Sequence, residues 1–339
     1  MLQLKPPLPP MEALAVNEIP TGGWQYEPKW DGFRCIAFRD GDDVYLQSKA
    51  EKPLGRYFPE IVAAVKALKP KRFVLDGEIA VPIEGRLNFD ELLQRIHPAE
   101  SRIRKLSTEH PAIYIVFDLL ADEKGVSLLE LPLEERRAKL EALAKHFDGA
   151  VRLSPATTKL SQAKRWFESV GGNLDGVIAK VLDCPYRSGD RTGMQKIKNI
   201  RTADCVVGGF RYGKNSKLVG SLLLGLYDAE GLLHHVGFTS TIRAADKAAI
   251  TKKLEKLIEA PGFTGSAPGG PSRWSTERST EWQPLRNEFV VEVAFDHFTT
   301  GRFRHGTSLH RWRPDKSPEQ CTFEQVASHA GADLSLLEA

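Results

Sequence analysis

The chain of 339 residues is long enough for two domains, and its 41% hydrophobic and 27% charged residues are typical of a globular protein. No apolar run approaches the roughly 18 residues of a membrane span, and the N-terminus lacks a signal-peptide pattern, so a cytoplasmic protein without a membrane anchor is expected. The four cysteines form no C-x-x-C pair, which argues against structural zinc and against a disulfide framework.

The net charge of +3 is distributed unevenly along the chain. Residues 187–217 contain eight Lys or Arg against two Asp, and residues 302–316 contain five against one. The rest of the chain is therefore acidic. Two basic segments on an acidic protein indicate a phosphate-bearing partner, with a solvated basic face as the alternative on charge alone.

The first 201 residues combine short strands with helices. A turn at Gly41–Asp42 predicts a hairpin within residues 34–49. Helices are predicted over residues 56–68, 88–97 and 132–147, the second with Asn88 as its N-cap and the third with its charges opposite an apolar face. Buried strands are predicted at 73–81, 112–120 and 175–182. Because strands and helices do not alternate strictly, we expect an α+β fold.

After Arg201 the pattern changes to short strands with Gly-rich or Asp-rich connections, interrupted by one helix around residues 244–260. About five strands and one helix in roughly 130 residues are typical of a small barrel of the OB type. Residues 261–280 contain 14 Pro, Gly, Ser or Thr and predict a long loop that is functional or mobile. The expected domains are residues 1–201 and residues 202–339, the latter with a C-terminal helix.

Lys29 lies in the stretch YEPKWDGFR, directly before a Trp-Asp-Gly sequence. A lysine amine attacks phosphorus only when neutral, and an unperturbed pKa of about 10.4 leaves roughly one molecule in a thousand competent at neutral pH. Burial and nearby cations lower such a pKa. Lys196 and Lys198 alternate along a predicted strand, so both point to one face and provide cations. Taken alone, a structural lysine beside a glycine turn is the commoner interpretation.

Six motifs follow one another in a characteristic order. They are Glu27–Lys29–Asp31–Gly32–Arg34, Ser48–Lys49, LDGEI at 75–79, VFDLL at 116–120, DGVIAK at 175–180 and KIK at 196–198. The series resembles the covalent nucleotidyltransferases, which include DNA ligases, RNA ligases and mRNA capping enzymes. With RFRHGTSLHRWRPDK at 302–316, nearly the whole chain is similar to the ATP-dependent DNA ligases of the compact bacterial ligase C type. This resemblance implies a nucleotidyltransferase domain of antiparallel sheets, followed by an OB-fold domain.

The resemblance also implies roles for individual residues. Lys29 would be the nucleophile that forms a lysyl-AMP intermediate. The ATP and AMP contacts would come from Glu27 and Phe117 at the adenine, Arg34 and Glu78 at the ribose, and Lys196, Lys198 and Arg191 at the α-phosphate. Arg313, Asp315 and Lys316 would orient the departing pyrophosphate. Gly32 is expected to let the backbone turn close to the nucleotide.

Two positions depart from the family pattern. Lys49 replaces the usual arginine at the proposed DNA 5′-phosphate contact, which keeps the charge but loses bidentate binding. Asp175 replaces the usual glutamate at the proposed site for Mg²⁺ or Mn²⁺, and its side chain is one methylene shorter. A simple turn before a strand is the alternative interpretation of Asp175–Gly176.

The leading hypothesis is an ATP-dependent DNA ligase that seals nicks in duplex DNA, through lysyl-AMP and 5′-adenylated DNA, during repair. An RNA ligase, a capping-type nucleotidyltransferase or a non-catalytic OB-fold nucleic-acid-binding protein are the alternatives. The expected co-substrate is ATP, and the expected partners are nicked DNA and end-binding or repair proteins. A bacterial, nucleoid-associated monomer is expected.

Overall fold

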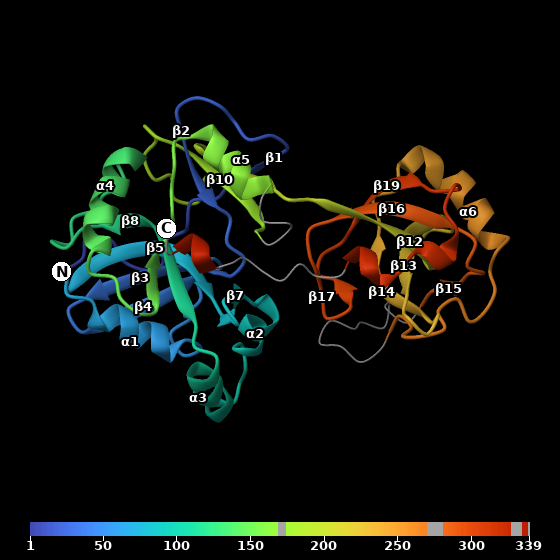
Figure 1. The fold of residues 1–339 in the computed structure, drawn as a ribbon, viewed down its shortest axis with the longest axis horizontal. Helices are drawn as coiled ribbons and strands as arrows, with labels where there is room; N and C mark the ends of the chain where they lie inside the picture. Colours follow the sequence, from blue (N-terminus) through green and yellow to red (C-terminus); the bar gives the residue numbers. More distant parts are fainter. Residues whose placement is uncertain (169–173, 270–280, 327–333, 338–339) are drawn as a thin grey trace. The chain divides into compact units, whose positions relative to one another are not determined.

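The computed structural model describes residues 1–168, 174–269, 281–326 and 334–337 (Figure 1). These residues form two compact units. The first unit extends to Asn199 and also contains residues 334–337, whereas the second begins at Ile200 and includes the described residues to Val326. The expected division into 1–201 and 202–339 differs from these units by two residues at the junction and by the assignment of the C-terminal segment.

The first unit is built on two β-sheets, in the orders β4-β3-β5-β8-β9 and β1-β11-β10-β2. Their strands are β1 (Leu14–Val16), β2 (Trp24–Pro28), β3 (Phe33–Asp40), β4 (Asp43–Ser48), β5 (Arg72–Ala80), β8 (Ile113–Ala121), β9 (Val151–Leu153), β10 (Gly176–Val181) and β11 (Met194–Lys198). A separate hairpin pairs β6 (Pro82–Ile83) with β7 (Arg86–Leu87). Only the β1–β11 and β8–β9 pairs among those described are parallel, so both sheets are mainly antiparallel.

The helices of the first unit are α1 (Pro59–Ala67), α2 (Phe89–Gln94), α3 (Glu100–Glu109), α4 (Leu133–Ala144) and α5 (Leu160–Glu168). The predicted hairpin is confirmed by the β3–β4 pairing around Gly41. Asn88 is confirmed as the N-cap of α2, since its side chain accepts from the Glu91 backbone N–H at 3.0 Å. Short-range signals thus placed these elements correctly.

The sequence pattern predicted that the charged side chains of α4 lie on its exposed face, but two of them do not. Arg136 and Arg137 are buried together with the leucines of the helix. Arg136 donates from Nε and Nη2 to both carboxylate oxygens of Asp118 on β8, at 2.9 and 3.0 Å. A buried carboxylate needs such a partner, because an unpaired charge in the interior is strongly unfavourable.

The second unit contains a sheet in the order β14-β13-β12-β16-β19, with β15 also paired to β12. Its elements are β12 (Arg201–Tyr212), β13 (Val219–Tyr227), β14 (Leu233–Thr239), α6 (Lys247–Glu255), β15 (Gln283–Pro284), β16 (Val290–Phe295), β17 (Phe298–Thr299), β18 (Arg302–Phe303) and β19 (Ser308–Trp312). Thr239, at the end of β14, bridges Thr307, which directly precedes β19. Because β14 and β19 are the two edges of the sheet, this bridge closes the sheet toward a barrel.

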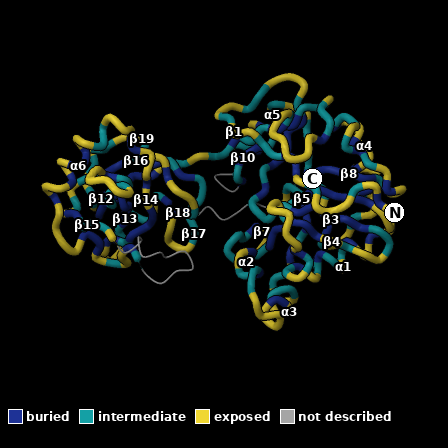
Figure 2. The backbone as a smooth tube through the Cα atoms, turned by 180° about the vertical axis from the view of Figure 1, so that it is seen from behind, coloured by how far each residue is buried: buried dark blue, intermediate teal, exposed yellow. Residues whose placement is uncertain are grey.

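Each unit has its own hydrophobic core, and Figure 2 shows the buried residues concentrated along the strands of both. The predicted helix around 244–260 is confirmed as α6, whose buried residues Ile250 and Leu254 belong to the second core. Of the expected C-terminal helix, the described residues include the short 3₁₀ turns Phe323–Val326 and Leu334–Leu337, and residues 327–333 and 338–339 lie outside the described part. Residues 270–280 of the predicted loop lie outside the described part. The described residues include no helix long and apolar enough to cross a membrane.

Candidate active site

A pocket of about 220 Å³ in the first unit collects residues from both sheets. Seven of the predicted site residues line it: Glu27, Lys29, Arg34, Lys49, Glu78, Phe117 and Lys196. They come from strands β2, β3, β5, β8 and β11 and from the turns that follow β2 and β4. Residues separated by up to 169 positions in the sequence therefore converge on one cavity.

Lys29 directly follows β2, and Asp175 directly precedes β10. Because β2 and β10 are antiparallel neighbours, the two residues lie opposite each other. The Lys29 N–H donates to the Gly176 carbonyl at 2.9 Å, and the Asp175 N–H donates to the Lys29 carbonyl at 3.3 Å. Their side chains form an ion pair between Lys29 Nζ and Asp175 Oδ2. Both backbone and side chains thus place this carboxylate beside the predicted nucleophile.

The pKa of Lys29 is raised, which is the opposite of the expected direction. Burial lowers it, but the carboxylates of Asp175, Asp31 and Glu78 more than reverse that effect. The expected lowering rested on burial and on nearby cations, without the carboxylates that the fold brings close to Lys29. Since the Asp175 carboxylate pairs directly with the amine in the folded chain, Lys29 is held as an ammonium in this state.

Glu27 and Lys180, which both line the pocket, form a buried ion pair. Lys180 Nζ lies 2.8 Å from both carboxylate oxygens of Glu27, and Gln25 Nε2 donates to the same carboxylate at 2.7 Å. Sequence analysis assigned no role to Lys180, although DGVIAK contains it. The pair fixes Glu27 as a hydrogen-bond acceptor facing the cavity.

Arg34 is held by Asp76, another residue that the sequence analysis did not single out. Its Nε and Nη2 each donate to an Asp76 carboxylate oxygen at 2.6 Å, and the Tyr186 hydroxyl donates to Oδ2 at 2.7 Å. The Arg34 guanidinium lies 4.6 Å from the centroid of the Phe117 ring. Asp76 therefore orients both the cation and, through it, the aromatic wall of the pocket.

The Glu78 side chain lines the same pocket. Burial raises its pKa to about 8, against the lowering effects of the Arg34 and Lys29 cations. In register, Glu78 stands opposite Arg34 across the β3–β5 pair. A protonated carboxyl at this position can donate a hydrogen bond as well as accept one.

Lys49 and Lys196 line the pocket, and further cations lie close enough to Lys196 to affect its pKa. Burial lowers the pKa of Lys196, and Lys198, Lys29, Lys49 and Arg191 lower it further. Lys49 and Arg191 both pair with Glu12, at 3.1 Å each, and Arg191 is not among the residues that line the cavity. Lys198 lies on β11, two residues beyond Lys196, and is likewise outside the lining.

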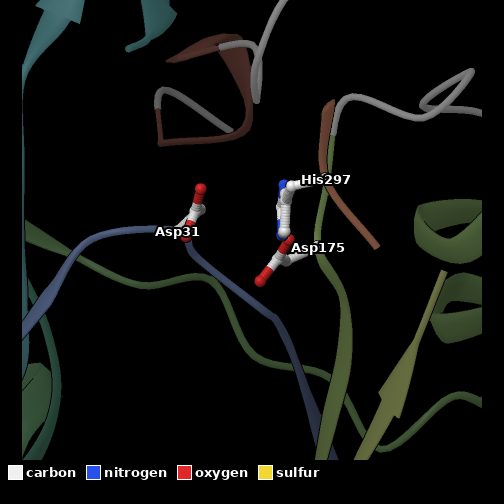
Figure 3. Close-up of side chains that lie close together, drawn as sticks. All are labelled: Asp31, Asp175 and His297. Atoms are coloured by element: carbon white, nitrogen blue, oxygen red, sulfur yellow. The ribbon is translucent and has the colours of Figure 1, made fainter. Parts of the chain in front are cut away.

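Two carboxylates beside Lys29 have the chemistry of a divalent-cation site. One carboxylate oxygen of Asp31 and one of Asp175 lie within 4.8 Å of each other (Figure 3). Hard oxygen ligands of this kind suit Mg²⁺, which usually retains several waters. His297, which Figure 3 also shows, belongs to the second unit. Within the first unit, the two carboxylates of Asp31 and Asp175 therefore fit the expected Mg²⁺ ion.

Packing against the protein itself already requires glycine at position 32. A Cβ added at Gly32 would lie 2.3 Å from the carbonyl oxygen of Ile79 and 2.8 Å from Cγ of Glu78. Any side chain would therefore displace the backbone of β5. This neighbour was not visible in the sequence.

In the second unit, Arg313 and Asp315 form a salt bridge of 2.8 Å beside Lys316. The Arg313 side chain accounts for the strongly lowered pKa of Asp315, which falls to about 2. The three residues predicted to orient pyrophosphate are thus adjacent to one another on the barrel.

A first unit with two mainly antiparallel sheets around a lysine-containing pocket, followed by a small barrel, is the architecture of the covalent nucleotidyltransferases. Family models described as "ATP dependent DNA ligase domain" and "ATP dependent DNA ligase C terminal region" match residues 10–198 and 215–316. The chain belongs to the ATP-dependent DNA ligases.

Two relatives cover almost the whole chain. DNA ligase C2 of Mycolicibacterium smegmatis is 45% identical and spans 96% of each chain, and DNA ligase C of Mycobacterium tuberculosis is 43% identical and spans 98% of each. A solved Lig E DNA ligase covers 89% of this chain and 99% of its own, with a TM-score of 0.54 and 16% identity, which shows a shared fold. The enzyme is therefore an ATP-dependent DNA ligase, and the α+β and OB-fold prediction is confirmed.

Proposed function

We propose that this ligase seals nicks in duplex DNA during repair, with Lys29 as the covalent nucleophile. The observation that carries the proposal is the position of Lys29 in a pocket with Glu27, Phe117 and Lys196. Such a pocket combines an acceptor and an aromatic wall for a base with cations for phosphates. Because the proposed substrate is DNA, we expect the enzyme at the bacterial nucleoid.

Three phosphoryl transfers account for sealing. In the first, Lys29 Nζ attacks the α-phosphorus of ATP, a P–N bond forms, the amine loses a proton, and pyrophosphate leaves. The DNA 5′-phosphate then attacks that phosphorus, which releases Lys29 and gives 5′-adenylated DNA. Finally the 3′-hydroxyl attacks the 5′-phosphorus, loses its proton and displaces AMP. Cations near each phosphorus stabilise the charge that develops in the transition state.

In the first transfer, different residues around the pocket contact the adenine, the ribose and the α-phosphate of ATP. Glu27, oriented by Lys180, accepts from the adenine amino group, while Phe117 stacks on the ring. Arg34 and Glu78 contact the ribose, and Lys196 and Lys198 contact the α-phosphate. Lys49 binds the DNA 5′-phosphate in the second transfer, and Arg191 is the weakest candidate because it is 65% exposed and pairs with Glu12.

Asp175 and Asp31 would hold a magnesium ion, or manganese in its place. When bound, such a cation neutralises carboxylates and stabilises charge on phosphate oxygens. The residues of the chain themselves set the protonation of the nucleophile, because the Asp175 carboxylate pairs with the Lys29 ammonium. Loss of that pairing lowers the pKa of Lys29 and favours the neutral amine.

Nick sealing on duplex DNA, compared with an RNA nick and with GTP in place of ATP, tests the proposal. We expect sealing of the DNA nick with ATP. Efficient sealing only of RNA, or labelling only by GTP, would favour the RNA-ligase or capping alternatives. Size-exclusion chromatography with light scattering checks the proposed monomer.

The two residues Asp315 and Lys316 are expected to separate the first transfer from the third. Asp315→Ala and Lys316→Ala should reduce self-labelling by ATP at least about tenfold, because pyrophosphate departure loses its orienting groups. Sealing of a chemically pre-adenylated nick should fall much less. Equal losses in both gel assays would assign the two residues to DNA binding or folding.

Binding of DNA is expected to depend on the basic segments 187–217 and 302–316. Each neutralised phosphate contributes a slope of roughly −0.9 to log affinity against log salt, so about 4–6 contacts predict a hundredfold to thousandfold loss between 50 and 200 mM salt. Lys214→Gln with Lys217→Gln should flatten that slope while ATP labelling persists, because both lysines are exposed in the β12–β13 connection. Fluorescence anisotropy on a nicked duplex, recorded over a series of salt concentrations, measures this slope.

The matched control removes two exposed lysines from α6 and its end, Lys252 and Lys256. This control should keep the wild-type slope. Equal slopes for the two double variants would place the DNA on another surface of the enzyme. Arg211 is a poorer test position than Lys214, because its side chain is only partly exposed.

A further inference from the structure

One buried carboxylate of the second unit contacts two of the pyrophosphate-orienting residues. Arg313 Nη1 lies 2.9 and 3.1 Å from the two carboxylate oxygens of Asp204, and Lys316 Nζ lies 2.8 Å from Oδ2. Asp204 is separated from these residues by more than 100 positions, and sequence analysis gave it no role. It therefore links strand β12 to the functional motif beyond β19.

The position of Asp204 is held from several sides. Asp204 pairs in register with Glu292 on β16, and only 8% of the residue is exposed. The Asp204 N–H donates to Gln325 Oε1 at 3.0 Å, and Gln325 Nε2 donates back to the Asp204 carbonyl at 3.2 Å. The Asp204 carboxylate is thus fixed in the sheet of the barrel, and it offers the flexible side chains of Arg313 and Lys316 a rigid hydrogen-bond acceptor.

Arg313 is held by carboxylates on two sides, whereas Lys316 is held by Asp204. The Arg313 Nε and Nη2 groups donate to Asp315, whose side chain is 63% exposed, and Nη1 donates to buried Asp204. An ammonium has three N–H donors, and the described contact with Asp204 occupies one of them. Further donors of Lys316 remain suited to phosphate oxygens.

The contact with Asp204 does not cover the two cations. Arg313 and Lys316 line a surface pocket of about 240 Å³, together with apolar residues that include Phe289 and Trp312. About one fifth of each cationic side chain is exposed, at 19% and 21%. The carboxylate thus orients the cations while an anion can still approach them.

We propose that Asp204 is a positioning residue for pyrophosphate departure, which holds Arg313 and Lys316 in the geometry needed for the first transfer. The inference rests on the proposed function of these two residues. The carboxylate makes no contact with ATP itself. It acts by reducing the number of conformations that the two long side chains sample before the phosphate arrives.

The test compares three reactions of Asp204→Asn, which keeps the size of the side chain and removes its charge. Self-labelling by ATP should fall at least about tenfold at saturating ATP. Release of ATP from labelled enzyme by added inorganic pyrophosphate should fall by a similar factor, because it is the reverse of the same step. Sealing of a pre-adenylated nick should stay within about threefold of wild type.

Glu292→Gln is the matched control, since it neutralises the neighbouring carboxylate that pairs with Arg311. It should leave labelling and pyrophosphate reversal unchanged. Asp204→Glu, which keeps the charge, should recover part of the reverse reaction. Melting temperatures of all variants show whether a loss reflects unfolding.

Several outcomes would overturn the inference. Unchanged labelling and reversal in folded Asp204→Asn, or equal losses in all three reactions, would make the carboxylate a purely structural group. Faster self-labelling by ATP would mean that the contacts with Asp204 keep Arg313 and Lys316 from acting on the phosphates. These results are distinct from failure of the proposed function, in which the Lys29→Ala enzyme would still be labelled by ATP.

Discussion

Replacement of Lys29 by alanine will abolish covalent labelling of the enzyme by ATP and, with it, sealing of nicks that are not already adenylated. No other group in the proposed first transfer forms the P–N bond. Lys29→Arg should be equally inactive, because a guanidinium remains protonated and cannot attack phosphorus. Radiolabelled ATP followed by denaturing gel electrophoresis measures the adduct directly.

A control and a mapping experiment complete the Lys29 test. Lys66→Ala removes an exposed lysine of α1 and should be labelled like the wild type. Mass spectrometry of the labelled wild type should find AMP on the peptide that contains Lys29. An adduct on either Lys29 variant, or on another peptide, would assign the nucleophile elsewhere.

Removal of the Asp175 carboxylate should reduce magnesium-dependent labelling at least about tenfold, because the cation loses one of its two proposed carboxylate ligands. Asp175→Ala and Asp175→Asn should both show this loss, with a higher magnesium requirement in a titration. Asp175→Glu, which restores the residue usual in the family, should retain activity. The labelling rate against magnesium concentration is the measurement.

The pH dependence of the labelling rate distinguishes two roles of Asp175, that of a metal ligand and that of an ion-pair partner of Lys29 alone. The Asp175 carboxylate contributes to the raised pKa of Lys29, so the wild-type labelling rate should rise with pH as more amine becomes neutral. If Asp175 acted only as an ion-pair partner, Asp175→Asn would lower that pKa and speed labelling near neutral pH. Faster labelling with unchanged magnesium dependence would therefore refute the metal assignment.

Local patterns predicted much of the fold. The Gly41–Asp42 turn placed the β3–β4 hairpin, and Asn88 placed the start of α2, because turn geometry and capping depend on a few neighbouring residues. The pattern failed for Arg136, whose buried partner Asp118 is 18 positions away. An amphipathic pattern assigns charges to solvent unless a specific tertiary partner is known.

The sequence by itself determined which residues to expect at the site, since the order of its motifs predicted seven residues, Lys29 among them, that line one cavity in the structure. The tertiary structure alone decided the environment of those residues. Asp175 contributes most to the raised pKa of Lys29, and Asp204 holds the barrel cations, in both cases across more than 100 positions. Electrostatic effects depend on distance in space, and strand pairing sets that distance independently of separation along the chain.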